Sequence, residues 1–272
     1  MKNDIVQIHY AYQTCDIKSY QSQKRFCGDD KTELCKKSLK SFLTSIKYCA
    51  DKANEVKHNI IIIDDHSTED LKNFIFNCQK EFTQENISID FMALGEKCGI
   101  KNSIEQCYLW MQKNGKDLVF QVQDDYIFIE TAIYEMIDLF FQIKAETGSD
   151  CLISPYNDSW LWLTAYRNQP TPRTVIVGKN RYWIQYYDMS CSFMTSHHNF
   201  SQHWDLYNSF FYFIDNKGKH KNDLENRSLN YMLTKRSILG LVPVSSVAFH
   251  MQSDLEKDPH IDWKPYWDAI EI

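Results

Sequence analysis

The sequence predicts an α/β fold in which helices cover both faces of a mostly parallel central sheet. The first half of the chain alternates strand patterns with segments of helical spacing, which is the order that builds parallel sheets. The run Ile60–Ile63 consists of four isoleucines without polar alternation, which is typical of a strand covered on both faces. Asp64 and Asp65 follow that run, and ligands of such sheets bind beyond the carboxyl ends of the strands.

The elements of this first half can be placed by their residue patterns. Strands are expected at 5–12, at the isoleucine run, at 87–94 and at 117–129. Helices are expected from Asp30, from Ser67, over 102–112 and over 133–141, because apolar residues recur there at helical spacing. Asp30 and Ser67 are residue types that begin helices by accepting a hydrogen bond from the first turn.

The second half of the chain has a different character. After Gly148, short strand patterns separated by polar turns lie at 152–153, 174–177, 182–187 and 191–194. Helices are expected over 201–211 and 226–234, and a last strand over 239–249 that ends in His250. Since no repeat or linker interrupts the chain, we expect a single domain over 1–272, with halves at 1–130 and 150–250 and a tail at 252–272.

Composition and charge argue against several classes of protein. The chain has 272 residues and a net charge of −6, an acidic balance that argues against a nucleic-acid partner. Its nine cysteines include no CxxC pair, so we expect reduced thiols in the cytoplasm and no metal–thiolate site. No run has the length and apolar character of a signal peptide or a transmembrane segment, so we expect neither.

Two pairs of carboxylates follow predicted strands. Asp64-Asp65 ends the isoleucine run, and Asp124-Asp125 interrupts the apolar stretch that begins near residue 117. A turn or a helix cap is the simplest interpretation of one such pair. A carboxylate at a strand end also binds Mg²⁺ or Mn²⁺ when a diphosphate supplies further oxygen ligands. Two pairs separated by two strand–helix units favour a shared site of this second kind.

Together these residues resemble a known family. The stretch IIIIDDHSTED resembles the strand-two signature of family 2 glycosyltransferases, and VFQVQDDYIF resembles the metal-binding acidic element, DxD, of the GT-A fold. The resemblance covers residues 5–250. It implies a GT-A-type nucleotide-diphospho-sugar transferase fold, in which 1–130 binds the nucleotide sugar and 150–250 forms a smaller mixed region on the acceptor side.

The resemblance also implies roles for particular residues. The end of the first strand, including Tyr10 and Tyr12, lines the nucleotide site, and Asp65 accepts a hydrogen bond from a base such as uracil. Asp125 ligates the metal ion, Asp124 faces the ribose or the sugar, and Lys101 in KCGIKN contacts a phosphate or the sugar. His66 stands where glycine is common in the family, and KCGIKN lacks the usual arginine.

Two later residues complete the expected site. Displacement at the anomeric carbon needs a carboxylate that takes the proton of the acceptor hydroxyl. The resemblance places it at the start of a late helix, where Glu225 is the candidate and Asp223 the alternative; an acid that stabilises the helix dipole is the structural interpretation of either. His250 resembles a late histidine that joins the metal ligands, and imidazole favours Mn²⁺ over Mg²⁺.

The predicted function is therefore a metal-dependent, inverting glycosyltransferase. The expected donor is a nucleotide sugar, with a UDP-sugar favoured, and the acceptor is a glycan or another hydroxyl compound. Two alternatives remain open. One is a nucleotidyltransferase on a similar sheet, although YAYQTCD lacks the glycine-rich phosphate loop that it needs. The other is a sugar- or nucleotide-binding protein without catalysis, which would keep its aspartates but have no working base.

Overall fold

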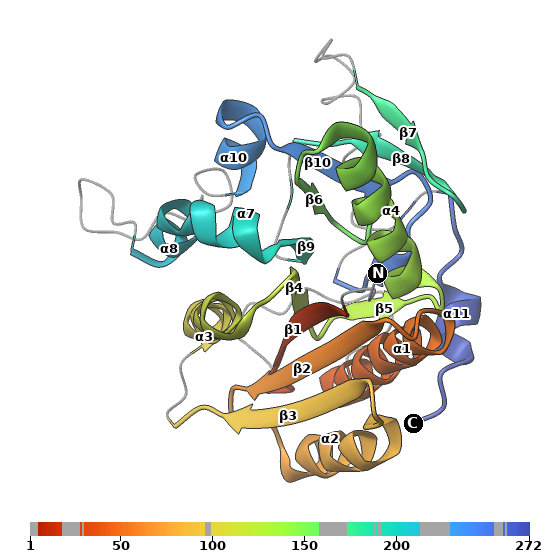
Figure 1. The fold of residues 1–272 in the computed structure, drawn as a ribbon. Coiled ribbons are helices and arrows are strands. Elements are labelled where there is room, and N and C mark those ends of the chain that lie inside the picture. Colours follow the sequence, from red (N-terminus) through yellow and green to blue (C-terminus); the bar gives the residue numbers. More distant parts are fainter. Residues whose placement is uncertain are drawn as a thin grey trace.

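The fold is organised around one large sheet with helices on both sides (Figure 1). The computed structural model describes residues 5–17, 28, 30–95, 99–157, 173–187, 189, 192–212, 229–252, 258 and 260–272, with only the backbone at 209–212. In this described part, a nine-stranded sheet has the order β3-β2-β1-β4-β9-β6-β10-β8-β7, and a second sheet pairs β11 with β5.

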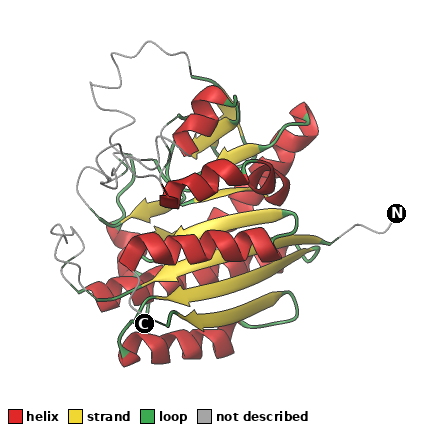
Figure 2. Ribbon diagram, turned by 90° about the vertical axis from the view of Figure 1, so that its left-hand side faces the viewer, coloured by secondary structure: helices red, strands yellow, loops and turns green. Residues whose placement is uncertain are grey.

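Four neighbouring strands form the parallel part of the large sheet. They are β3 (Ile87–Ala93), β2 (Val56–Asp64), β1 (Val6–Thr14) and β4 (Leu118–Gln123). Thr14 lies beside Asp64, and Gln13 lies beside Gln123. The arrows of these strands point to the same side of the molecule in Figure 2. The residues that follow β1, β2 and β4 therefore meet at one edge of the sheet.

The other strands of this sheet are shorter. They are β6 (Cys151–Ile153), β7 (Val175–Val177), β8 (Tyr182–Gln185), β9 (Phe193–Ser196) and β10 (Leu239–Pro243). β9 is antiparallel to β4 and β6, β10 is parallel to β6, and β8 is antiparallel to β10 and β7. Among the described strands of this sheet, only β8 and β9 run against β4. The prediction of an α/β chain with a mostly parallel sheet is confirmed.

Two layers of helices enclose this sheet (Figure 1). One layer holds α1 (Lys31–Lys52), α2 (Glu69–Phe82) and α4 (Ala132–Thr147). The other holds α3 (Gly99–Asn114), α7 (His197–Gln202), α8 (Trp204–Tyr212) and α10 (Leu229–Lys235). Because neighbouring strand residues point to opposite faces, Ile62 joins the buried cluster on the α1 side and Ile63 the cluster on the α3 side. The isoleucine run is thus covered on both faces, as its composition predicts.

The N-terminal caps of α1 and α2 can be compared with the residues that the sequence predicts for them. Asp30 caps α1 by accepting a hydrogen bond from the N–H of Glu33 at 3.0 Å, as expected. The expected cap of α2, Ser67, is wrong by one residue, since Thr68 is the N-cap. The reason is that the carboxylate of Asp64 accepts the N–H of Ser67 at 3.1 Å, so Ser67 belongs to the turn that closes β2.

Two segments expected as single strands each divide in two. The stretch 117–129 forms β4 and then β5 (Tyr126–Phe128), and 239–249 forms β10 and then β11 (Ala248–His250). The chain turns at Asp124-Asp125 and bends at Val244-Ser245, and both continuations leave the large sheet there. β5 and β11 then pair antiparallel, with Tyr126 beside His250. The expected helix 201–211 also divides, into α7 and α8.

The final described helix is α11 (Lys264–Asp268). It lies beside the first turns of α1 in Figure 1. In the described part of the chain, no helix combines the length and apolar character that a bilayer crossing requires.

Candidate functional site

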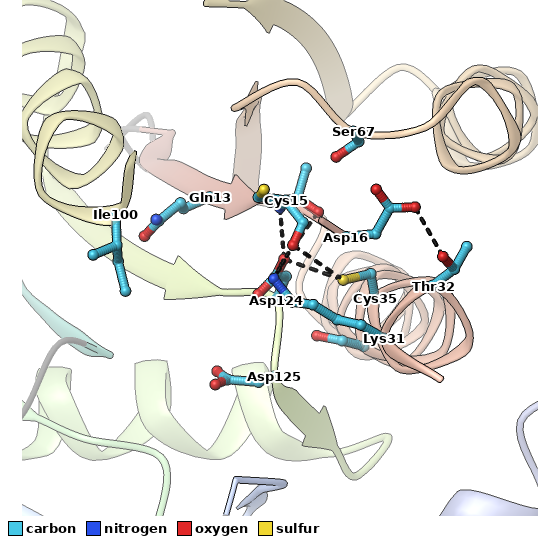
Figure 3. Close-up of polar contacts among 12 residues, drawn as sticks. Gln13, Cys15, Asp16, Lys31, Thr32, Cys35, Ser67, Ile100, Asp124 and Asp125 are labelled. Atoms are coloured by element: carbon cyan, nitrogen blue, oxygen red, sulfur yellow. Dashed lines mark hydrogen bonds and ion pairs between the residues drawn. The ribbon is translucent and has the colours of Figure 1, made fainter. Parts of the chain in front are cut away.

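The candidate site is the edge where β1, β2 and β4 end. Figure 3 shows this edge with the start of α1 on one side and the start of α3 on the other. Carboxylates follow all three strands: Asp16 after β1, Asp65 after β2, and Asp124 and Asp125 after β4. Their concentration at the carboxyl ends of parallel strands makes this edge suited to a cation, or to an anion that arrives with a cation.

Asp124 fixes the connection between β1 and α1. Its Oδ2 accepts hydrogen bonds from the N–H of Cys15 at 2.7 Å and the hydroxyl of Thr14 at 3.2 Å, and it lies 3.9 Å from Nζ of Lys31. The thiol of Cys35 also donates to this oxygen at 3.1 Å. Burial, and then the charge of Asp124, raise the pKa of Cys35 well above its ordinary value, which keeps this thiol protonated and able to donate.

Asp125 points to a different part of the molecule. Its Oδ2 lies 3.3 Å from Nε2 of His250, on the strand that pairs with β5. The imidazole of His250 stacks on the ring of Tyr126, with centroids 4.5 Å apart and planes 3° from parallel. The ring of Tyr156 makes a T-shaped contact with the same imidazole, with centroids 5.5 Å apart. The structure thus brings together Asp125 and His250, the two residues expected to hold a metal ion.

The Asp125–His250 pair has a geometry that suits a divalent cation. Two ligands at about 2.1 Å from one ion, at right angles, lie about 3 Å apart, which is close to the 3.3 Å between Oδ2 of Asp125 and Nε2 of His250. In the described part of the chain, no third His, Cys, Asp or Glu side chain completes a metal-binding group. An ion held by this pair would take its remaining ligands from a diphosphate or water, as Mg²⁺ commonly does.

Asp65 lies at the base of the same edge and is tied to α3. Its Oδ2 accepts the N–H of Gly99, the first residue of α3, at 2.8 Å, and its Oδ1 lies 3.1 Å from Nδ1 of His66. Only 2% of Asp65 is exposed. His66 has a φ of 64°, in the left-handed region that favours glycine, which explains why this position suits glycine.

The start of α3 is held to the sheet by a second contact. Nε2 of Gln13, on β1, donates to the hydroxyl of Ser103 at 2.7 Å. Lys101 lies between these two anchors of α3, in the first turn and half-buried. Its expected contact with a phosphate or a sugar remains a prediction.

Asp16 is a residue that the sequence analysis missed. Its two oxygens accept hydrogen bonds from the hydroxyl of Thr32 at 2.9 Å, from the N–H of Thr68 at 2.9 Å and from the hydroxyl of Thr68 at 2.5 Å. It therefore joins the start of α1 to the start of α2 (Figure 3). The available signal was its position: a carboxylate two residues beyond a strand, next to the acidic end of the neighbouring strand.

The two tyrosines expected to line the nucleotide site lie elsewhere. Tyr10 and Tyr12 are fully buried on the α1 side of the sheet. The hydroxyl of Tyr10 bonds to Nδ1 of His58 at 2.8 Å, and that of Tyr12 donates to Ser38 at 2.9 Å. The expectation is wrong because β1 extends to Thr14, two residues beyond the predicted end, so the strand end that reaches the site carries Cys15 and Asp16.

Two further residues of the expected site cannot be placed. Glu225, the candidate base, and Asp223, its alternative, fall in 213–228, outside the described residues.

Burial also affects the carboxylate closest to the sheet. Asp64 is fully buried at the end of β2. Burial raises its pKa, and hydrogen bonds from Ser67 oppose that rise. The charge of Asp16 adds a smaller contribution in the same direction as burial.

Comparison with known proteins gives only distant similarities. No protein-family model and no curated protein match the chain. Among solved structures, it is similar to the mannosyltransferase PcManGT from Pyrobaculum calidifontis in complex with GDP-Man and Mn²⁺, at 9% identity and a TM-score of 0.37, over 56% of this chain and 36% of that one. It is also similar to S. aureus TarS, at 10% identity and a TM-score of 0.47, over 87% of this chain and 35% of that one.

A shorter form of the second protein, S. aureus TarS 1–349, gives 11% identity and a TM-score of 0.44, over 87% of this chain and 60% of that one. The chain therefore spans less than two thirds of each of these three structures. With TM-scores below 0.5, these similarities carry no functional conclusion for this chain.

Proposed function

We propose that this protein is a metal-dependent glycosyltransferase, with a GT-A-type fold, that moves a sugar from a nucleotide-diphosphate donor to a hydroxyl acceptor. The observation that carries the proposal is the Asp125–His250 pair. A carboxylate and an imidazole from strands far apart in sequence meet 3.3 Å apart, directly after a parallel strand of the sheet. This is the place where nucleotides bind in open α/β sheets.

The donor would lie across the ends of β1, β2 and β4. Asp125 and His250 would hold Mn²⁺ or Mg²⁺, and the bound ion would neutralise charge on the leaving nucleoside diphosphate. Asp65 would form the base of the nucleotide site and accept a hydrogen bond from the nucleobase, with uracil as the first candidate. Lys101, in the first turn of α3, would contact a phosphate or the sugar.

Asp124 and Lys31 would shape the edge around the donor. Asp124 holds the β1–α1 connection through the N–H of Cys15 and lies 3.9 Å from Nζ of Lys31. This places a lysine beside the edge where a diphosphate would lie, and its cation favours such an anion. The contact of Asp124 with a ribose or sugar remains part of the proposal.

An inverting reaction also needs a base on the acceptor side. We assign this role to Glu225, with Asp223 as the alternative; either carboxylate would take the proton of the attacking hydroxyl. The change Glu225→Gln separates a transferase from a protein that only binds sugars or nucleotides. A transferase loses turnover and keeps its affinity for the donor, whereas a binding protein loses nothing.

The decisive experiment is a thermal-shift screen of nucleotide sugars, each with and without Mn²⁺. A ligand that binds only the native state raises the melting temperature, so the screen identifies the base and tests the metal together. UDP-sugars and GDP-sugars would be compared first. We expect a shift that needs both the donor and Mn²⁺, and its loss in Asp125→Asn.

A positive donor is then tested for sugar transfer, with Glu81→Gln as the control because Glu81 pairs with Lys40 on an exposed surface of α1 and α2. A screen in which no nucleotide sugar stabilises the protein, or in which Asp125→Asn keeps the full metal-dependent shift, would refute the proposal.

A further inference from the structure

β5, which begins directly after Asp125, and β11, which ends in His250, form a narrow ribbon with two different faces. β5 and β11 contribute three residues each, and their register places Ile127 beside Phe249 and Tyr126 beside His250. Because side chains alternate along a strand, Tyr126 and His250 share one face and Ile127 and Phe249 the other. Tyr126 joins the main core, whereas Ile127 and Phe249 join a separate buried cluster.

The second face of this ribbon is covered by α11. Trp267 packs in one buried cluster with Ile127, Phe249, Met251 and Leu34 of α1, and only 8% of Trp267 is exposed. The backbone pairing of β5 with β11 extends by one more hydrogen bond, because the N–H of Met251 donates to the carbonyl oxygen of Asp125 at 2.8 Å. The packing of Trp267 is therefore one layer away from the proposed metal ligands.

Polar contacts fix the covering segment in place. Nζ of Lys37 donates to the carbonyl oxygen of Trp267 at 2.9 Å and lies 4.7 Å from the centre of its ring. Lys37 is itself 7% exposed, so this cation is buried against the tryptophan. Nearer to β11, the carboxylate of Asp258 accepts the N–H of Ser246 at 2.7 Å, which holds the turn from which β11 starts.

A two-stranded ribbon is at best marginally stable by itself and needs packing against other elements. The pairing of β5 with β11 sets the separation of the Asp125 carboxylate from the His250 imidazole. We propose that Trp267 is a positioning residue for the Asp125–His250 pair: by covering Ile127 and Phe249 it holds β11 against β5. This inference rests on the proposed function in one respect, namely that the pair binds a metal ion.

The test is the affinity for Mn²⁺ with UDP present, measured by electron paramagnetic resonance of the free ion, because the proposed site takes its remaining ligands from a diphosphate. Outer groups that orient metal ligands typically contribute about 10-fold to 100-fold in affinity, so we expect Trp267→Ala to weaken Mn²⁺ binding about 10-fold. Trp267→Phe keeps an aromatic ring in the cluster and should recover most of the affinity. Lys37→Met removes the polar contacts of Nζ with the Trp267 carbonyl, the Trp267 ring and Glu33 but leaves the indole in place, so it should give a smaller loss.

The matched control is Phe200→Ala. Phe200 lies on α7 and is fully buried, so its loss also lowers stability, but it belongs to the α3-side cluster, which contains no residue of the ribbon. We expect this control to lower the melting temperature without changing Mn²⁺ affinity. If Trp267→Ala does not fold, Trp267→Phe and Lys37→Met decide the question.

The positioning role of Trp267 and the metal site itself are contradicted by different results. Wild-type affinity in folded Trp267→Ala, or in Lys37→Met where Trp267→Ala does not fold, overturns the positioning role and leaves the proposed function intact. A wild-type protein that does not bind Mn²⁺ with UDP present, or an Asp125→Asn variant that binds it as tightly, overturns the metal site and with it both proposals.

Discussion

Asp124 and Asp125 are adjacent in sequence, yet the structure gives them different tasks. The perturbation that separates them is the same isosteric change at each position, Asp124→Asn and Asp125→Asn. It removes a negative charge and keeps the shape of the side chain. We expect Asp124→Asn to affect mainly the free energy of unfolding and Asp125→Asn to affect mainly metal binding.

The magnitude for Asp124 follows from its contacts. One oxygen accepts the N–H of Cys15 at 2.7 Å and the hydroxyl of Thr14 at 3.2 Å, and 14% of the side chain is exposed. Hydrogen bonds to a charged group contribute about 1.5–3 kcal/mol each. An asparagine oxygen still accepts but without the charge, so we expect Asp124→Asn to lower the free energy of unfolding by about 2–3 kcal/mol.

The expected cost for Asp125 is smaller. An asparagine at this position keeps a side-chain oxygen near Nε2 of His250, and it removes one negative charge from an edge with several. Repulsion among neighbouring carboxylates destabilises such an edge. We therefore expect Asp125→Asn to lower the free energy of unfolding by about 1 kcal/mol or less, while Mn²⁺ binding is lost.

Urea unfolding at pH 7 measures the first quantity and a Mn²⁺ titration the second, on the same three proteins. Equal slopes of free energy against urea would show that the variants unfold over similar surfaces. The assignment is refuted if Asp125→Asn is the less stable variant, or if Asp124→Asn loses Mn²⁺ binding while Asp125→Asn keeps it.

Three further predictions concern histidines. His250→Ala should weaken activity with Mn²⁺ more than activity with Mg²⁺, since imidazole favours manganese; an unchanged ratio of the two activities would exclude His250 as a ligand. Burial lowers the pKa of His58 to about 3, so the unfolded chain takes up this proton first as the pH falls below about 6.5, and the protein loses about 2 kcal/mol of stability between pH 7 and pH 5 from this group. His58→Gln should reduce the pH 7 to pH 5 difference in urea unfolding by that amount, and an equal difference in both proteins would contradict it. His66→Gly should raise the melting temperature, because the φ of 64° at His66 is strained by about 1 kcal/mol for a residue with a Cβ; a lower melting temperature would show that the contact with Asp65 outweighs the strain.

The sequence is most informative where local patterns agree with burial. The isoleucine run identifies β2 because both of its faces are covered, and Asp30 identifies the start of α1 because its cap depends on neighbouring residues only. The end of β1, by contrast, depends on residues far away in the sequence. Thr14 joins the strand because it pairs with Asp64 of β2, and the pattern of the first strand alone gives no signal for those two added residues.

The same distinction explains the candidate site. The carboxylates at the ends of β2 and β4 are visible in the sequence, since each directly follows an apolar strand. The contact between Asp125 and His250 depends on β11 returning to β5, and the apolar stretch 239–249 gives no sign that it divides between two sheets. Only the resemblance to a family pointed to His250, whereas the tyrosines were misplaced because the strand end was placed two residues early.

The carboxylates at this edge fall into two groups, and the division bears on how the site works. Asp16 joins the starts of α1 and α2, Asp65 holds the start of α3, and Asp124 holds the β1–α1 connection. These three accept hydrogen bonds from the backbone of connecting segments, so they determine the shape of the edge. Asp125 instead faces an imidazole from β11. A frame of hydrogen-bonded carboxylates around one carboxylate–imidazole pair would suit a metal site that substrate oxygens complete, because the protein ligands must keep their positions when the substrate leaves.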